Sequence, residues 1–295
     1  SRQHIVNVLA DTATRLGVAI QAESPVAGAD PAGVLLLADG SRLAADLLIG
    51  ADGVHSVVRD SLGLVAERRQ LGDGATRTLV SRTPEDVAED VTLGPMTCEY
   101  WAGTRRVITS PCSSRDLYVV MSCLADDVSG RAIPADVASW SASFPHLETL
   151  FERIAREADP ARIRWTAFET VRLRRWYAGR VAVLGDAAHA MPPNLGQGSG
   201  CAMMNALAIA AALDDHDDVE HALAAWERRE RPLTEHTQKW SMLYGQVTTW
   251  PEWGRSLAFN VLGGIGWVRR QYQRTANHIP TGCRADSSPA QGATS

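Results

Sequence analysis

The 295-residue sequence lacks the features that mark small secreted proteins and nucleic-acid-binding modules. It contains five cysteines, none with the C-x-x-C spacing of a zinc ribbon or redox motif, so we expect reduced thiols and a cytoplasmic location. With 29 Lys and Arg against 34 Asp and Glu, the net charge is -5, and no long basic run is present. This balance argues against nucleic acid or an anionic membrane as the main partner.

Long hydrophobic runs are also missing. The two longest candidates, Cys201–Leu213 and Ser256–Val268, are shorter than the roughly 18 residues that a membrane span needs. Ser1–Leu16 has the spacing of an amphipathic helix, and the charged residues inside it argue against a signal peptide. No G-x-S-x-G is present to form a serine hydrolase elbow. A hydrophobic fraction of 45% still provides a sizeable core for one large or two medium domains.

Two parts of the chain share a pattern in which a short apolar strand is followed by a helix. Leu47–Gly50 and Val181–Leu184 are continuous apolar runs, as expected for strands buried on both faces. Helices are predicted to follow them at Ser56–Leu62 and Gly198–Leu213. Residues 71–174 instead alternate and are rich in Thr, Val, Arg and Trp, which predicts a mostly antiparallel sheet.

Local signals predict several smaller elements. Asp39-Gly40 between two apolar runs indicates a β-hairpin. Short helices are expected over the antiparallel sheet at 135–144 and 147–157. Pro232 is expected to separate two C-terminal helices, 219–230 and 233–244.

These patterns predict an α/β fold that contains an inserted β-rich domain. Residues 1–70 and 177–213 would be two parts of one α/β domain, and 71–176 would be the inserted sheet. Residues 214–280 would form C-terminal helices, and 281–295 would be a disordered tail.

The first apolar strand ends in Ala51-Asp52-Gly53, shortly before a helix. Asp52 can accept hydrogen bonds from loop amides, and Gly53 allows the backbone to approach a phosphate-bearing ligand. An ordinary turn stabilised by an Asp side chain explains the same residues equally well.

A more unusual string follows the second strand: Gly185-Asp186-Ala187-Ala188-His189, then Pro192-Pro193 and Gly196-Gln197-Gly198. Asp186 stands at the strand end, where open α/β sheets bind ligands. The first amides of the next helix have no internal partner, which suits an anion or a group that becomes anionic. A plain strand–loop–helix connector explains this string poorly. We expect a structural hydrogen bond from His189 rather than a role as a base.

The two motifs resemble the fingerprints of the class A flavoprotein monooxygenases, the para-hydroxybenzoate hydroxylase-like family. The resemblance extends from Arg2 to about Tyr244. Ser110-Pro111-Cys112 and Gly198–Met203 look most similar to hydroxypyridine-carboxylate oxygenases, which hydroxylate and open a pyridine ring. The resemblance implies a three-layer FAD-binding domain with an inserted antiparallel β-sheet substrate domain and C-terminal helices. It also implies FAD as cofactor and NAD(P)H as a transient co-substrate.

Roles for individual residues follow from this resemblance. Asp186 would bond the ribityl chain or ribose of FAD, and the Pro193 carbonyl would face the isoalloxazine ring. The amides around Gly198 would meet the flavin where negative charge gathers on reduction. The implied cofactor-binding residues are Arg2, Asp52, Arg59, Asp186, Pro193, Gly196, Gly198, Ser199 and Gly200.

The chain departs from the family pattern in two places. Many relatives have Asn where this chain has Gly200, so a side-chain contact is lost there. The family also opens with a G-x-G-x-x-G turn for the FAD pyrophosphate, and none occurs here. Arg2 would touch the FAD phosphates, and Asp52 with Arg59 would shape the pyrophosphate region and the approach of NAD(P)H. We expect an incomplete flavoenzyme (a fragment, half of a split protein or a mis-started product) that binds FAD weakly by itself.

Arg106 and Tyr118 are the predicted substrate-binding residues. They lie on strand candidates joined by the turn-rich stretch 110–116, and a hairpin could set them side by side. Arg106 would clamp a substrate carboxylate, and Tyr118 would hydrogen-bond a ring hydroxyl. The alternative is a solvent-facing Arg–Tyr pair on an edge hairpin.

The predicted function is an FAD-dependent, NAD(P)H-using monooxygenase. Its substrates would be molecular oxygen and a small hydroxylated aromatic or N-heteroaromatic acid, which it would hydroxylate or hydroxylate and open. The alternatives are a reductase or epoxidase of the same fold, or a non-catalytic remnant without stable FAD. No metal is expected, because the acidic stretch 214–221 is better explained as a solvated connector that caps a helix.

Overall fold

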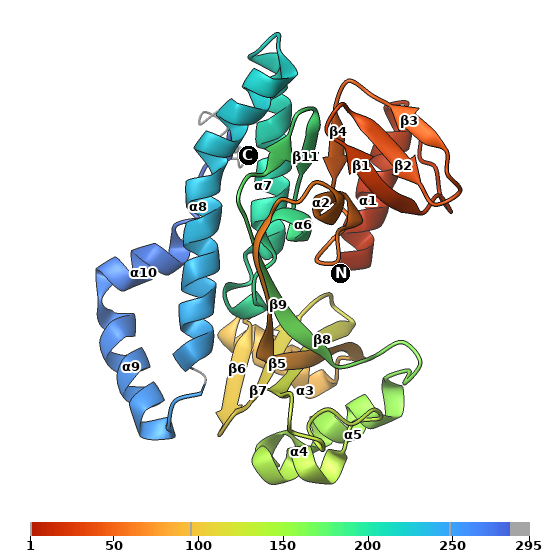
Figure 1. Ribbon diagram of the computed structural model, residues 1–295. Helices are drawn as coiled ribbons and strands as arrows, with labels where there is room; N and C mark the ends of the chain where they lie inside the picture. Colours follow the sequence, from red (N-terminus) through yellow and green to blue (C-terminus); the bar gives the residue numbers. More distant parts are fainter. Residues whose placement is uncertain (1, 95, 248, 284–295) are drawn as a thin grey trace, which may run out of the picture. The chain divides into compact units, whose positions relative to one another are not determined.

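The computed structural model describes residues 2–94, 96–247 and 249–283, and the chain divides into two compact units (Figure 1). Unit 1 comprises the N-terminal segment to Glu23 together with Gln70–Phe168. Unit 2 comprises Ser24–Arg69 together with the chain from Glu169 onward.

The central sheet of unit 2 contains the two predicted buried strands. β4 (Leu48–Gly50) and β11 (Val181–Val183) pair in parallel, with Gly50 opposite Val183. β10 (Tyr177–Ala178) pairs antiparallel with the other side of β11. All three residues of β11 are fully buried, which explains its continuous apolar sequence. The parallel pairing means that both strands end at the same edge of the sheet.

A second sheet of unit 2 contains the predicted hairpin. β2 (Val34–Leu37) and β3 (Arg42–Ala44) pair antiparallel around Asp39-Gly40, and Gly40 has a φ of 86° that suits glycine. The hairpin is therefore confirmed. β1 (Val26–Asp30) completes this sheet beside β2 and was missed, because its small residues give a weak strand signal.

The remaining elements of unit 2 are helical. They are α2 (Val57–Ser61), α6 (Asp186–His189), the short 3-10 helix η2 (Pro193–Leu195), α7 (Gly198–Asp214), α8 (Val219–Val247), α9 (Glu252–Gly264) and α10 (Gly266–Gln273). The helices expected at 56–62 and 198–213 are thus confirmed as α2 and α7.

The expected break at Pro232 is wrong, because α8 continues through it as one helix. Proline removes one backbone donor, but neighbouring interactions hold the chain helical. Arg231 bridges Glu227 and Glu235, one turn to each side, with N–O distances of 2.6 and 2.7 Å. Buried residues on both sides of the proline form one continuous face: Ala222, Leu223, Trp226, Glu230, Thr234, Thr237 and Ser241.

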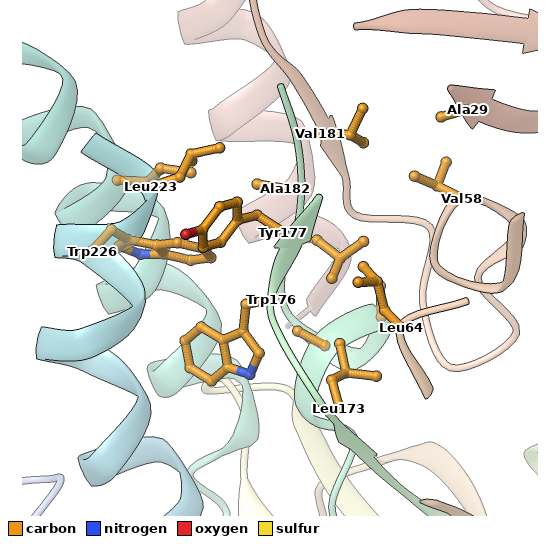
Figure 2. Packing of buried hydrophobic residues seen from close by; sticks show 14 of the residues in the cluster. Ala29, Val58, Leu64, Leu173, Trp176, Tyr177, Val181, Ala182, Leu223 and Trp226 are labelled. Carbon is orange, nitrogen blue, oxygen red and sulfur yellow. The ribbon is translucent and has the colours of Figure 1, made fainter. Parts of the chain in front are cut away.

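The core of unit 2 is mostly aliphatic and contains the large rings of Trp176, Tyr177 and Trp226 (Figure 2). Trp176 and Trp226 are almost fully buried, and their ring centroids lie 5.2 Å apart. Val181 and Ala182 of β11 pack into the same cluster, as does Leu223 of α8. This core therefore fixes the central sheet against α8.

Unit 1 is built around a five-stranded sheet. Across the sheet, the strands are β6 (Cys98–Ala102), β7 (Arg105–Pro111), β8 (Asp116–Leu124), β5 (Val65–Ser81) and β9 (Thr166–Leu173). The β6–β7, β7–β8 and β8–β5 pairs are antiparallel, as predicted. The helices of this unit are α1 (Arg2–Arg15), α3 (Pro84–Leu93), α4 (Val137–Ser143), η1 (Pro145–Leu147) and α5 (Glu148–Glu157). Of these, α1, α4 and α5 were expected and α3 was not.

The two faces of this sheet differ. Val107, Val119 and Met121 pack on one face against Trp140 of α4 and Phe151 of α5, in a single hydrophobic cluster. Because side chains alternate along a strand, the residues between them belong to the other face.

No described helix is long and apolar enough to cross a membrane. The predicted disordered tail lies largely outside the described residues, which end at Cys283.

The core predicts a clear contrast between two tryptophans. Trp226→Ala should lower the free energy of unfolding by about 3–5 kcal/mol, because Trp226 is fully buried and its loss leaves a cavity. Trp253→Ala is the matched control: Trp253 is 75% exposed, and its change should stay within about 0.5 kcal/mol. Urea denaturation followed by circular dichroism measures both, and equal destabilisation would contradict the assigned core.

Candidate cofactor and substrate sites

The two sequence motifs meet at one edge of the central sheet of unit 2. The backbone N–H of Leu184, just after β11, donates to the carbonyl of Gly50 at the end of β4, at 2.8 Å. Asp52 follows β4 and Asp186 follows β11, so both acidic residues lie beyond the same strand ends. Each motif could be found in the sequence, whereas their meeting depends on the parallel pairing.

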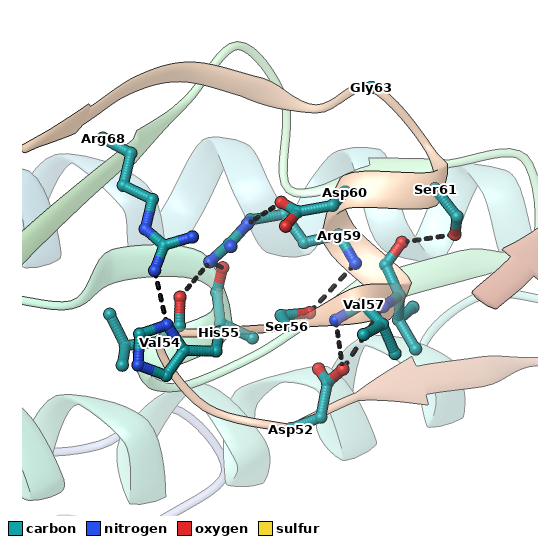
Figure 3. A network of polar contacts seen from close by, with 12 residues as sticks. Asp52, Val54, His55, Ser56, Val57, Arg59, Asp60, Ser61, Gly63 and Arg68 are labelled. Atoms are coloured by element: carbon teal, nitrogen blue, oxygen red, sulfur yellow. Dashed lines mark hydrogen bonds and ion pairs between the residues drawn. The ribbon is translucent and has the colours of Figure 1, made fainter. Parts of the chain in front are cut away.

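Asp52 caps the helix that follows it (Figure 3). Its Oδ2 accepts hydrogen bonds from the amides of Val57 at 2.8 Å and Val58 at 3.2 Å. Ser56 adds a second cap by accepting from the amide of Arg59 at 2.9 Å. The expectation that Asp52 bonds loop amides is therefore confirmed, and its exposed side chain stays at the surface.

Arg59 joins the loops that follow the two strands. Its guanidinium is fully buried and donates to the carbonyl of Val54 at 3.0 Å and to that of Ala187 at 3.3 Å. Its Nε pairs with Asp60 at 2.8 Å. Arg59 thus shapes the strand-end region from inside the protein, and no part of its side chain is exposed.

Asp186 is presented by an unusual backbone. Gly185 precedes it with a φ of 62° and a ψ of -141°, a conformation that other residues rarely adopt. Asp186 then begins α6 with an exposed side chain, while Ala187, Ala188 and His189 turn into the core. The sharp turn therefore directs the carboxylate outward from the strand end.

The segment from Ala190 to Asn194 is held by polar residues of α8. The side-chain amide of Gln238 donates to the backbone carbonyl of Ala190 at 3.0 Å, and the hydroxyl of Ser241 donates to the backbone carbonyl of Pro192 at 2.6 Å. The side-chain amide of Asn194 donates to the backbone carbonyl of Ser241 at 3.0 Å. Gln238 and Ser241 were missed from the sequence; their only signal there is polar character within a helix.

A glycine-rich turn leads from this segment into α7. Gly196 has a φ of 64°, and its amide donates to the Pro193 carbonyl at 2.9 Å. The first helical bond recorded at the start of α7 runs from Cys201 to Gln197, at 2.9 Å. The amides of Gly198, Ser199 and Gly200 precede that bond, in the turn where helical amides have no intrahelical acceptor.

The surface at this helix end fits a flat, electron-rich group such as the flavin of FAD. A Cβ added to Gly200 would meet nothing within 4 Å, so open space lies beside the helix end. A separate hollow of about 450 Å³ lies beside Gly196 and Gly200, between α7 and the segment 275–280; Asp186, Gly198 and Ser199 do not line it. Partial positive charge at a helix N-terminus also suits the side of the flavin that becomes negative.

Arg2 begins α1, but its side chain lies outside the described part of the structure. Its predicted contact with the FAD phosphates stays a prediction.

His189 has the structural surroundings expected of it. Its ring is buried and packs 5.6 Å from the Trp176 ring. The amide nitrogen of Asn205 lies 3.1 Å from Nε2 and also donates to the Thr234 hydroxyl. Because the Asn205 amide donates, Nε2 must be an acceptor, and the ring is neutral. Burial lowers the pKa of His189 to about 4, from an ordinary value of 6.5.

The predicted substrate residues share one face of the unit 1 sheet. Arg106 lies opposite Ser122, and Tyr118 lies opposite Ser110. Paired residues of antiparallel strands share a face, so Arg106 and Tyr118 do as well. They are not side by side, however: four residues separate them along the strands, roughly 13 Å. The predicted adjacency is wrong. Odd or even position along a strand determines which face a side chain occupies, but it does not determine which residues of the two strands lie opposite each other.

The surroundings of Arg106 exclude the solvent-facing alternative. Its side chain is only 3% exposed, and β7 lies inside the sheet between β6 and β8. The guanidinium stacks over the Trp101 ring at 5.2 Å. Burial raises the pKa of the nearby Asp73 carboxyl, and the charge of Arg106 opposes that rise. The face therefore has a buried cation close to a partly buried acid.

The acidic connector 214–218 caps α8, as expected: Asp218 Oδ2 accepts from the amide of His221 at 2.8 Å. The described residues contain no group of three His, Cys, Asp or Glu side chains arranged to hold a metal ion.

The buried neutral His189 predicts a loss of stability in acid. Below pH 6.5 the unfolded chain binds a proton at this histidine, whereas the folded chain does so only near pH 4. The free energy of unfolding should therefore fall by up to about 3 kcal/mol as the pH falls through this window. Urea denaturation at several pH values, compared with His189→Gln, isolates this contribution. His278→Gln, at an exposed histidine, is the control.

The protein family and the individual proteins that this chain resembles agree with the predicted FAD-binding fold. Residues 2–237 match the model of the FAD binding domain family. A putative 2-heptyl-3-hydroxy-4(1H)-quinolone synthase of Rhodococcus erythropolis is 37% identical over 282 residues, which cover 96% of this chain and 72% of that protein. An FAD-dependent urate hydroxylase of Mycolicibacterium vanbaalenii is 36% identical over 208 residues, covering 66% of this chain and 49% of that protein.

Solved structures agree with these relatives. The tetrameric form of 2-methyl-3-hydroxypyridine-5-carboxylic acid oxygenase superposes with a TM-score of 0.78 and 36% identity, covering 95% of this chain and 71% of that chain. The predicted family and FAD-binding fold are therefore confirmed. The chain belongs to the FAD-binding domain family of FAD-dependent monooxygenases.

Proposed function

We propose that the protein uses NAD(P)H and molecular oxygen to hydroxylate a small N-heteroaromatic ring that carries a hydroxyl group and a carboxylate. The observation that carries the proposal is the joined strand-end site of unit 2, where the exposed Asp186 and the amide-rich start of α7 suit FAD. Two relatives support the ring chemistry, because their names describe oxygenation of a hydroxypyridine and formation of a hydroxyquinolone.

Unit 2 would hold the cofactor. Asp186 would accept a hydrogen bond from a ribityl or ribose hydroxyl, and the amides of Gly198, Ser199 and Gly200 would donate to the flavin edge. Bound FAD would supply the oxygen-transfer chemistry, which the protein itself does not possess. Arg59 would act indirectly, since it binds the Ala187 carbonyl next to Asp186, and Asp52 would fix the turn between β4 and α2.

Unit 1 would hold the substrate on the sheet face that carries Arg106 and Tyr118. A buried guanidinium that is already stacked on Trp101 is preorganised to bind a carboxylate with little loss of side-chain freedom. Tyr118, roughly 13 Å along the sheet, would contact a different end of the substrate.

A second candidate is hydroxylation of an alkylquinolone, which carries no carboxylate. Three relatives named as 2-heptyl-3-hydroxy-4(1H)-quinolone synthases, at 36 to 37% identity, favour it. Arg106 separates the two candidates, because only a carboxylate substrate needs its charge.

A cytoplasmic location is also proposed. All five cysteines are free thiols in the described structure, as expected in a reducing compartment.

Asp186 is tested through the affinity for FAD. A charged hydrogen bond is worth about 1.5–3 kcal/mol, so Asp186→Ala in the full-length protein should weaken FAD binding roughly 10- to 150-fold. Titration of flavin fluorescence measures this, and Asp217→Ala, in the exposed connector, is the matched control. Unchanged affinity in Asp186→Ala would remove this residue from the cofactor site.

Arg106 is tested through substrate kinetics in the full-length protein. Arg106→Met should raise KM for 2-methyl-3-hydroxypyridine-5-carboxylate roughly 10- to 150-fold and uncouple NAD(P)H oxidation from product formation. FAD content should stay unchanged. Tyr118→Phe should have a smaller effect, because one neutral hydrogen bond is lost.

The same assays decide between the substrates. Oxygenation of the pyridine acid, detected by mass spectrometry with labelled dioxygen, supports the first candidate. Turnover of 2-heptyl-4(1H)-quinolone alone, with kinetics insensitive to Arg106→Met, would support the second. NAD(P)H oxidation without an oxygenated product from either ring would contradict both.

A further inference from the structure

The last two helices of unit 2 expose an unusual number of large apolar side chains. Trp253, Leu257 and Val261 are 75%, 58% and 52% exposed, and their spacing of four residues sets them in one stripe along α9. We call this stripe the C-terminal apolar face; it comprises Trp253, Leu257 and Val261.

This face is separate from the contacts that attach the two helices to α8. Figure 1 shows α9 and α10 beside one half of α8. On α10, Trp267 and Tyr272 pack against Trp240 of α8, with ring centroids 5.9 and 5.1 Å apart. On α9, the Phe259 ring lies 5.7 Å from that of Tyr244 of α8. Ala258 and Val268 are buried. The helices are thus already packed through their inner side, and the apolar stripe on α9 faces away from that packing.

The charge around the face is strongly positive. Residues 249–283 contain four arginines and one glutamate, a formal charge of +3, although the whole chain carries -5. Arg255 is buried, so three of these arginines lie at the surface. Arg269, Arg270 and Arg274 are exposed; Arg270 of α10 and Arg274 at its C-cap lie three and seven residues after Trp267, on the same side of the helix. The mild overall acidity therefore conceals a local surface of opposite sign.

We propose that the C-terminal apolar face binds the surface of an anionic phospholipid bilayer, with α9 and α10 lying in the interface. Trp253, Leu257 and Val261 would enter the boundary between headgroups and acyl chains, and Arg270 and Arg274 would meet lipid phosphates. The cytoplasmic leaflet is negatively charged and attracts such surfaces. A second copy of the chain suits this face less well, since a two-fold contact would bring the arginines of both copies together.

Cosedimentation of the full-length protein with large unilamellar vesicles tests this proposal, which does not depend on the substrate. Vesicles of phosphatidylglycerol and phosphatidylcholine in equal parts should bind the protein roughly 10- to 100-fold more tightly than pure phosphatidylcholine. High salt should weaken the binding.

Two variants assign the binding to this face. Trp253→Ser combined with Leu257→Ser, at exposed positions that folding does not need, should weaken vesicle binding at least about tenfold. Arg270→Gln combined with Arg274→Gln should reduce the preference for phosphatidylglycerol. Val128→Ser, at a residue 81% exposed, and Arg162→Gln, also exposed, are matched controls and should bind as the unchanged protein does.

Three results would overturn the proposal. The protein could fail to sediment with the anionic vesicles, or the double serine variant could sediment as well as the controls. Light scattering without lipid could also show self-association that the double serine variant abolishes. That last result would assign the face to a second copy of the chain.

Discussion

The parallel pairing of β4 with β11 is the constraint on which the candidate cofactor site depends. The two strands are far apart in the chain, and Gly50 lies opposite Val183. Because parallel strands end at the same edge, this one register brings Asp52 and Asp186 to a common site. The buried valines of β11 and the Trp176–Trp226 pair hold the strands in place. Arg59 then ties together the loops beyond the strand ends.

Buried polar groups make this edge rigid as well as correctly placed. A buried donor or acceptor that is hydrogen-bonded accepts few alternative geometries, although Arg59 Nη2 and His189 Nδ1 are buried here without a partner. Gln238 and Ser241 hold the carbonyls of Ala190 and Pro192, and Asn205 holds His189. The exposed groups that would contact FAD therefore stand on loops that are fixed from behind. This is the preorganisation that favours binding of a charged cofactor.

Average composition conceals two local features of this chain. The net charge of -5 hides the arginines beside Trp267, and the ordinary hydrophobic fraction hides an exposed stripe on α9. In unit 1 the strands alternate, so one sheet face supplies the core under α4 and α5 while the other carries Arg106 and Tyr118. The exposed stripe and the two sheet faces both depend on which side of an element a residue occupies. For α9, that side is determined by the packing of Phe259 against Tyr244 of α8.

The sequence by itself determined whatever depends on near neighbours. Continuous apolar runs predicted β4 and β11, Asp39-Gly40 predicted the hairpin, and the Gly-Asp-Ala-Ala-His string indicated the family. Tertiary structure decided the rest. The helix α8 passes through Pro232 because Arg231 pairs with residues one turn away on both sides and because a long face is buried. The separation of Arg106 from Tyr118 follows from the register of β7 on β8. Such outcomes depend on the summed energy of many contacts between distant residues, which no local pattern contains.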